Sequence, residues 1–133
     1  MCTFAVEKIE QIRDDSKIHF CKLFKNSRCF FDDFVNGIRE NTIDYKSLVS
    51  IFAIMDSMAE YDYKLPLSKF NSIKKGHNVI GYEFKKDALR VYCVKKEPNV
   101  FVILGGYKKN QKKDIEKFIR LIGEAQSFLD GLS

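Results

Sequence analysis

The residues of this sequence best suited to chemistry are four lysines at the start of a predicted helix near the carboxyl end of the chain. They are Lys108, Lys109, Lys112 and Lys113. The amino end of a helix carries partial positive charge, so lysines there cost stability, about a few tenths of a kcal/mol each when exposed. Side chains that break a local rule without structural gain indicate a functional site. A phosphate or other anion, held by these lysines and by the backbone N–H groups of the first helical turn, would account for the arrangement.

Charge is divided unevenly along the chain. Residues 1–63 carry eight Lys/Arg and eleven Asp/Glu, a net charge of −3, whereas residues 64–133 carry fifteen and seven, a net charge of +8. A basic half of this kind is typical of proteins that bind a polyanion, most often RNA or DNA. The alternative is that many of these lysines form an ordinary solvated surface.

Three strands and a long helix must position the lysines. The strands are predicted over Val79–Lys86, Ala88–Lys95 and Val100–Leu104, with tight turns between them. In the second strand, Leu89, Val91 and Cys93 face one side and Arg90, Tyr92 and Val94 the other, so one face is apolar and the other mixed. The helix, with Asn110 as a candidate cap, buries an apolar stripe. Its members are Ile115, Phe118, Ile119, Ile122, Ala125 and Leu129.

The first half of the chain predicts two strands followed by two helices. The strands are Thr3–Ile9 and Ile18–Phe24, which could pair in antiparallel fashion. The helices are Phe31–Ile38 and Tyr45–Tyr61, the second capped by Asp44. Because Pro66 cannot continue a helix, we expect an extended connector over Lys64–Phe70 and then a turn over Lys74–Asn78.

Size and composition predict one domain over residues 1–133, with a mass of 15.5 kDa. No apolar run is long enough for a membrane helix and no secretory signal is recognisable, so we expect a cytoplasmic protein. The four scattered cysteines suit reduced core thiols. His19 and Cys21 are better read as strand residues than as a metal site. We expect neither a metal nor a cofactor.

Several of these segments together resemble the RelE/HigB superfamily of toxins from bacterial toxin–antitoxin pairs, in particular its phage-derived HigB-like branch. The segments are NVIGYEFK (78–85), LRVY (89–92) and VFVILGGYKKNQK (100–112), with the upstream run 20–38 resembling the family's first strand and helix. The similarity covers about Ile18 to Leu129, which leaves residues 1–17 as an extra strand or arm. The resemblance implies an α+β fold: a small curved antiparallel sheet packed with a carboxy-terminal helix and two helices from the first half.

The activity that the resemblance implies is cleavage of mRNA, usually on the ribosome, by attack of a 2′-hydroxyl on the adjacent phosphorus. Arg90, Lys85, Lys108 and Lys109 would stabilise charge on the phosphate, and Tyr107 would stack on a base or merely pack. Further RNA contacts are assigned to Lys112, Lys113, Tyr92 and Lys86. Each assignment has a structural alternative, which for Arg90 is an ion pair with Glu83 and for Lys85 a solvated strand lysine.

The proton-transfer groups of such a reaction are hard to find in this sequence. Some family members place an acid or base near the chain end, but the residues after Phe128 offer no clear equivalent. Tyr82, Tyr92 and Tyr107 remain, and tyrosines are poor bases unless their pKa is lowered. Two alternatives therefore stay open: a ParE-type toxin that inhibits DNA gyrase, or an inactive relative that binds RNA. The resemblance also implies a cognate antitoxin protein as partner.

Overall fold

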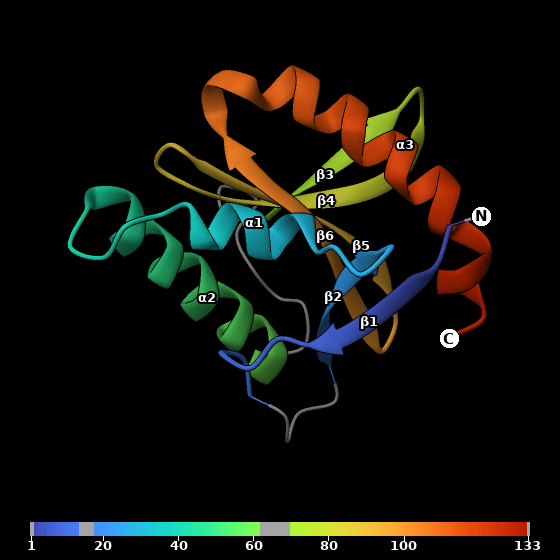
Figure 1. The fold of residues 1–133 in the computed structure, drawn as a ribbon, viewed down its shortest axis with the longest axis horizontal. Helices are drawn as coiled ribbons and strands as arrows, with labels where there is room; N and C mark the ends of the chain where they lie inside the picture. The colour runs from blue at the N-terminus through green and yellow to red at the C-terminus, as the bar shows by residue number, and fades with distance from the viewer. Residues whose placement is uncertain (1, 14–17, 62–69, 133) are drawn as a thin grey trace.

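A computed structural model describes residues 2–13, 18–61 and 70–132 of the chain (Figure 1). The strands are β1 (Phe4–Lys8), β2 (His19–Lys25), β3 (Phe70–Lys75), β4 (Asn78–Lys86), β5 (Leu89–Lys96) and β6 (Asn99–Tyr107). The helices are α1 (Phe30–Asn36), α2 (Ile43–Tyr61) and α3 (Gln111–Asp130), and a short 3₁₀ turn, η1 (Lys108–Asn110), precedes α3. The prediction of an α+β fold with a carboxy-terminal helix is confirmed.

The six strands form one sheet in the order β1-β2-β6-β5-β4-β3. The predicted antiparallel pairing of β1 with β2 is confirmed, and β3 to β6 form an antiparallel meander. The prediction of a wholly antiparallel sheet is wrong, because β2 and β6 are parallel, with His19 beside Asn99. No hairpin joins these two strands, and the long connection between them lets the chain return in the same direction.

Helices cover both faces of the sheet, with α1 and α2 on one side and α3 on the other (Figure 1). Side chains alternate along β5 as predicted, and they belong to two different cores, one on each face of the sheet. Leu89, Val91 and Cys93 belong to the core beneath α1 and α2. Tyr92 and Val94 belong to the core beneath α3. Because helices cover both sides, the central strands β5 and β6 are buried along most of their length.

The strand β3 was not expected from the sequence. Residues 64–69 of the predicted connector lie outside the described residues, but Phe70 begins β3 rather than ending a connector. The Phe70 ring stacks on Tyr82 with centroids 4.7 Å apart and also contacts Phe84. This aromatic packing anchors β3 at the edge of the sheet, and the turn predicted over Lys74–Asn78 shortens to the β3–β4 connection at Gly76 and His77.

Two helices begin earlier than predicted. The helix α2 starts at Ile43, so Asp44 lies inside its first turn and the prediction of Asp44 as cap is wrong. The hydroxyl of Thr42 takes that place and accepts a hydrogen bond from the backbone N–H of Tyr45 at 3.1 Å. At α1, the Cys29 thiol accepts from the N–H of Asp32 at 3.4 Å.

The amino-terminal residues contact α3 on one face of the sheet and α2 on the other. The strand β1 lies at the sheet edge, where Phe4 packs against Phe128 of α3 with ring centroids 5.9 Å apart. Further along, the guanidinium of Arg13 makes an ion pair with Asp56 of α2 at 3.1 Å. The Arg13 hydrogen bonds lower the pKa of the Asp56 carboxyl. The strand predicted over Thr3–Ile9 is therefore confirmed as β1, an edge strand of the sheet.

The cysteines are all free thiols. Cys29 and Cys93 are buried as expected of core thiols, and burial raises the pKa of Cys29 to about 11. Cys21 is half-buried in β2, two residues after His19, and Cys2 is exposed, so a core position is wrong for Cys2. Among the residues that the structure describes, no group of His, Cys, Asp and Glu side chains is arranged to hold a metal ion. No helix in residues 2–13, 18–61 and 70–132 is long and apolar enough to cross a membrane.

Candidate nucleic-acid interface

Strand pairing brings most of the predicted site residues to one end of the sheet. Lys85 on β4 lies beside Arg90 on β5, and Arg90 lies beside Gly106 on β6. The turn η1 follows β6 directly, and the backbone N–H of Lys108 donates to the carbonyl of Ala88 at 2.7 Å. This bond holds the lysine segment against the β4–β5 turn. Lys85, Arg90 and the start of the lysine segment therefore lie at the same end of the sheet.

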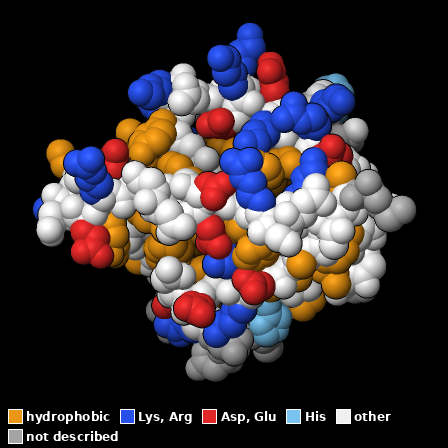
Figure 2. Space-filling view, viewed as in Figure 1, with side chains coloured by type: hydrophobic (Ala, Val, Ile, Leu, Met, Phe, Trp, Pro, Cys, Tyr) orange, Lys and Arg blue, Asp and Glu red, His pale blue; other side chains and the backbone are white. Residues whose placement is uncertain are grey.

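The lysines at the start of α3 are exposed. Lys108 and Lys109 lie in η1, and Lys112 and Lys113 lie in the first turn of α3. Figure 2 shows Lys and Arg side chains gathered over α3 and the β3–β4 hairpin on this face of the molecule. Asn110 occupies the N-cap position of α3, as predicted, but its side chain makes no capping hydrogen bond. The dipole conflict expected from the sequence is therefore present in the fold.

An open depression of about 840 Å³ lies beside the first two of these lysines. It is lined by Lys108, Lys109, Tyr107, Ala88 and Asp44, so it runs from η1 toward the start of α2. Tyr107 is half-buried and packs edge-on against Phe34, with ring centroids 5.6 Å apart. Of the two roles expected for Tyr107, packing is the one that the structure shows, although the residue also lines the depression.

Arg90 has a different environment from the one expected. Its side chain is 7% exposed, and its Nη1 atom donates to the backbone carbonyls of Asp87 at 2.9 Å and Leu89 at 2.8 Å. The proposed ion pair with Glu83 is absent from the described part of the chain, because the Glu83 carboxylate accepts instead from Gln111 at 2.8 Å. A buried guanidinium that binds backbone carbonyls braces the β4–β5 turn, so the prediction of Arg90 as an accessible phosphate ligand is wrong.

Tyr92 is also unavailable to RNA. It is 0% exposed and its ring packs against Phe118 of α3, with centroids 6.1 Å apart. Burial raises the pKa of its hydroxyl far above the usual value, and the carboxylates of Glu83 and Asp114 raise it further. The prediction that Tyr92 contacts RNA is wrong, and its raised pKa also excludes it as a base.

The two strand lysines differ in exposure. Lys86 is exposed at the end of β4, which is compatible with the RNA contact predicted for it. Lys85 is half-buried and takes part in interactions within the fold, so it is not the free surface lysine of the alternative reading.

A second, smaller depression lies between α1 and the start of α3 and contains charged residues that sequence reasoning missed. Its volume is about 310 Å³. Asp114 and Lys117 of α3 line it, together with Arg28, which forms an ion pair with Asp33 at 2.7 Å. The Lys117 ammonium lies 3.9 Å from the centroid of the Phe30 ring. Carboxylate and ammonium groups thus share one partly enclosed space.

Two consecutive glycines of β6, Gly105 and Gly106, line this second depression. A methyl group on Gly105 would overlap the Phe34 ring of α1, and one on Gly106 would overlap the carboxylate of Asp114. Both helices therefore approach the backbone of β6 more closely than any other residue type would permit. The strand was predicted to end at Leu104, but β6 continues through both glycines to Tyr107.

The pKa values of the two α3 residues are shifted toward each other. Burial raises the pKa of the Asp114 carboxyl, an effect that Lys117 partly offsets. Burial, with a further contribution from Arg28, lowers the pKa of the Lys117 ammonium. A raised pKa makes the Asp114 carboxylate a stronger base, and a lowered pKa makes the Lys117 ammonium a stronger acid, than the same groups in water.

Comparison with known proteins found no relative of this chain. No family model matches the chain, and neither a curated protein nor a solved structure matches it.

Proposed function

We propose that this protein is an RNA-binding toxin of the RelE/HigB kind that cleaves mRNA, with the lysines of η1 and α3 as its phosphate-binding surface. The observation that carries the proposal is the position of Lys108, Lys109, Lys112 and Lys113, all exposed around an uncapped helix start beside an open depression. Four lysines there destabilise the helix unless an anion is bound. RNA supplies a row of such anions.

The arrangement of elements supports the resemblance as well. Two helices follow the β2 strand and pack on one face of the sheet, and the carboxy-terminal helix packs on the other, as the resemblance implies. The segment resembling the family's basic motif falls at the end of β6 and the start of α3. These features favour the toxin family over an unrelated basic protein.

Asp114 and Lys117 are the proton-transfer groups in this proposal. The Asp114 carboxylate accepts the proton of the attacking 2′-hydroxyl, and its raised pKa makes it a stronger base than an exposed aspartate. Lys117, whose pKa is lowered, donates a proton to the leaving oxygen. The exposed lysines stabilise the charge that develops on the phosphate. The reaction thus needs neither Arg90 nor a residue at the chain end.

The phosphate-binding role is tested by the double variant Lys108→Ala/Lys109→Ala. We expect its affinity for a fluorescein-labelled single-stranded RNA to fall roughly tenfold and the slope of log K against log[salt] to decrease by about 1.4, since two phosphate contacts are lost. The matched control is Lys74→Ala/Lys75→Ala, which removes the same charge from the β3–β4 hairpin. Equal losses in both variants would mean that binding depends only on net charge.

The cleavage step is tested by Asp114→Asn, which keeps the shape of the side chain over Gly106. We expect RNA binding to be retained and cleavage of mRNA, followed by primer extension after induced expression, to fall at least about a hundredfold. In the unaltered protein the cleavage rate should rise as pH increases through the pKa of Asp114, because the base must be deprotonated. Cleavage that persists in Asp114→Asn would remove Asp114 from the mechanism.

One observation favours a second function, that of a relative that binds RNA without cutting it. Arg90 and Tyr92, which match the family's strand motif, are both buried. In that case the double lysine variant would still lose RNA affinity, but no mRNA cuts would appear in any variant. A DNA-damage response with intact mRNA would instead indicate a gyrase-directed toxin of the ParE type.

The proposal includes the ribosome-bound message as substrate and a cognate antitoxin as partner. An acidic antitoxin segment suits the net charge of +8 in residues 64–133.

A further inference from the structure

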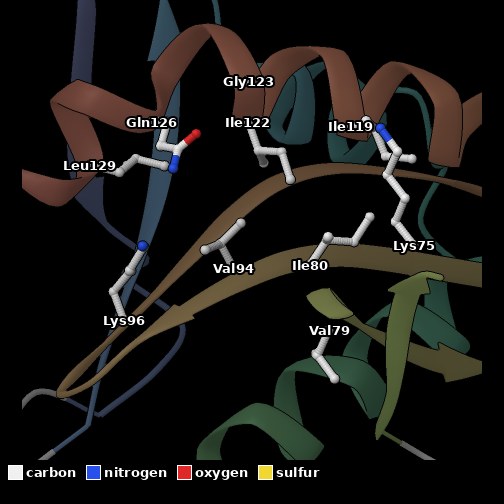
Figure 3. A pocket seen from close by; sticks show the side chains of 10 residues that line it. All are labelled: Lys75, Val79, Ile80, Val94, Lys96, Ile119, Ile122, Gly123, Gln126 and Leu129. Carbon is white, nitrogen blue, oxygen red and sulfur yellow. The ribbon is translucent and has the colours of Figure 1, made fainter. Parts of the chain in front are cut away.

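An apolar groove runs along the second half of α3, away from the lysines of η1. Its volume is about 360 Å³, and it lies between α3 and the strands β3, β4 and β5 (Figure 3). Six aliphatic side chains line it: Val79, Ile80, Val94, Ile119, Ile122 and Leu129. In Figure 3, Ile122 points from α3 toward the sheet, and Ile80 and Val94 point from the sheet toward α3. The helix therefore leaves part of the outer sheet uncovered.

Several of these side chains remain accessible to water. Ile80, Ile119 and Ile122 are half-buried, and Val79 is 49% exposed. A contiguous apolar surface of this kind on a small protein is typical of an interaction site. The groove follows α3 from Ile119 to Leu129, which corresponds to about 15 Å at 1.5 Å per residue. This length matches about three turns of a second helix.

Lysines mark both ends of the groove. Lys75 lies at the end near Ile119, and Lys96 lies at the end near Leu129 and Gln126 (Figure 3). Lys96 makes an ion pair with Asp130 at 2.7 Å, but both side chains are partly exposed, so this pair contributes little and can be shared with an incoming carboxylate. Acidic groups at both ends of a ligand would therefore be attracted.

We propose that the groove receives one amphipathic helix of a partner protein, about three turns long, with aliphatic residues on one face and carboxylates at its two ends. Anchors at i, i+4 and i+7 would fill the space between α3 and the sheet. A fatty acid has a single carboxylate, so it could pair with only one of the two lysines. A second copy of this chain on a twofold axis would present the same basic groove to itself, which like charges oppose. This inference stands whether or not the protein cleaves RNA.

The test uses a synthetic helical peptide with leucines at i, i+4 and i+7 and glutamates at both ends. We expect it to shift the methyl NMR signals of Ile80, Val94, Ile119 and Ile122 in a saturable way. The variant Lys75→Glu, a surface change that preserves the core, should bind it roughly fivefold more weakly. Replacing the glutamates at the corresponding end of the peptide with lysines should restore affinity for this variant.

A second variant places a charge inside the groove. Ile122→Glu should abolish peptide binding, and the matched control Ile43→Glu should not, because Ile43 is 76% exposed at the start of α2. Circular dichroism checks that both variants are folded. If Ile122→Glu does not fold, the peptide affinity of Lys75→Glu tests the proposal. Methyl shifts elsewhere, unchanged affinity in Lys75→Glu, or groove signals that change with protein concentration alone would overturn the proposal. RNA affinity should be unchanged in Lys75→Glu, which separates this site from the lysines of η1.

Discussion

Replacing Arg90 with alanine is expected to lower the free energy of unfolding by about 2–4 kcal/mol. The substitution leaves the carbonyls of Asp87 and Leu89 without their guanidinium donor and opens a cavity where the Arg90 side chain, only 7% exposed, was packed. Urea denaturation followed by circular dichroism measures the loss. Arg120→Ala, which removes an exposed arginine from α3, is the matched control and should change stability by less than about 0.5 kcal/mol.

The same variant separates a structural arginine from a catalytic one. A protein with Arg90→Ala that remains as stable as the unaltered chain but no longer cleaves RNA would show that the guanidinium acts on substrate. We expect the opposite result: the free energy of unfolding falls, and the RNA affinity per folded molecule stays the same.

Replacing Gly81 with alanine is expected to lower the free energy of unfolding by about 1–3 kcal/mol, because the core is overpacked. The added methyl group would overlap the tip of the Phe118 ring and lie 2.9 Å from the carbonyl oxygen of Cys93. The Phe118 ring is 0% exposed and the oxygen belongs to the backbone of β5, so neither can move away without disturbing the core. Thermal unfolding of the variant should therefore begin at a clearly lower temperature.

Gly123 provides the control for this substitution. A methyl group there meets no described residue within 4 Å, and Gly123 lies inside α3, so Gly123→Ala should stabilise the protein by about 0.5–1 kcal/mol. The Phe118 contact is isolated by a double-mutant cycle, in which Gly81→Ala combined with Phe118→Leu should cost less than the two single changes together. Strict additivity would show that the ring is not the obstacle.

The sequence predicted elements with strong periodicity well and contacts between elements poorly. Alternation in β5 correctly placed Arg90 and Tyr92 on the face opposite Leu89 and Val91. It could not reveal that α3 lies over that mixed face, and so Arg90 and Tyr92 were assigned to contacts with RNA. Burial of a polar residue depends on what packs above it, which the pattern of a single strand does not contain.

Edge strands and parallel pairs were hard to predict for related reasons. In β3 only Phe70 and Ile73 are buried, and the register shifts between Ile73 and Lys74, so no two-residue alternation is visible. The parallel pairing of β2 with β6 depends on the whole intervening chain rather than on any local turn.

The site was only partly visible in the sequence. The lysines of η1 were found because they violate a local rule, whereas Asp114 looked like an ordinary acidic residue at a helix start. A clue existed in Gly105 and Gly106, since two glycines inside an apolar strand indicate a close approach of other elements. That clue points to Phe34 and Asp114, the residues that occupy the space above and below the pair.

The parallel contact between β2 and β6 has a consequence for how the protein folds during synthesis. The strand at His19 leaves the ribosome early, but its neighbour at Asn99 is made only after both helices and three further strands. Until then the β1–β2 hairpin has an open edge, and its apolar residues lack their central partner. Such long-range closure slows folding and exposes an aggregation-prone edge, so rapid overproduction should favour inclusion bodies.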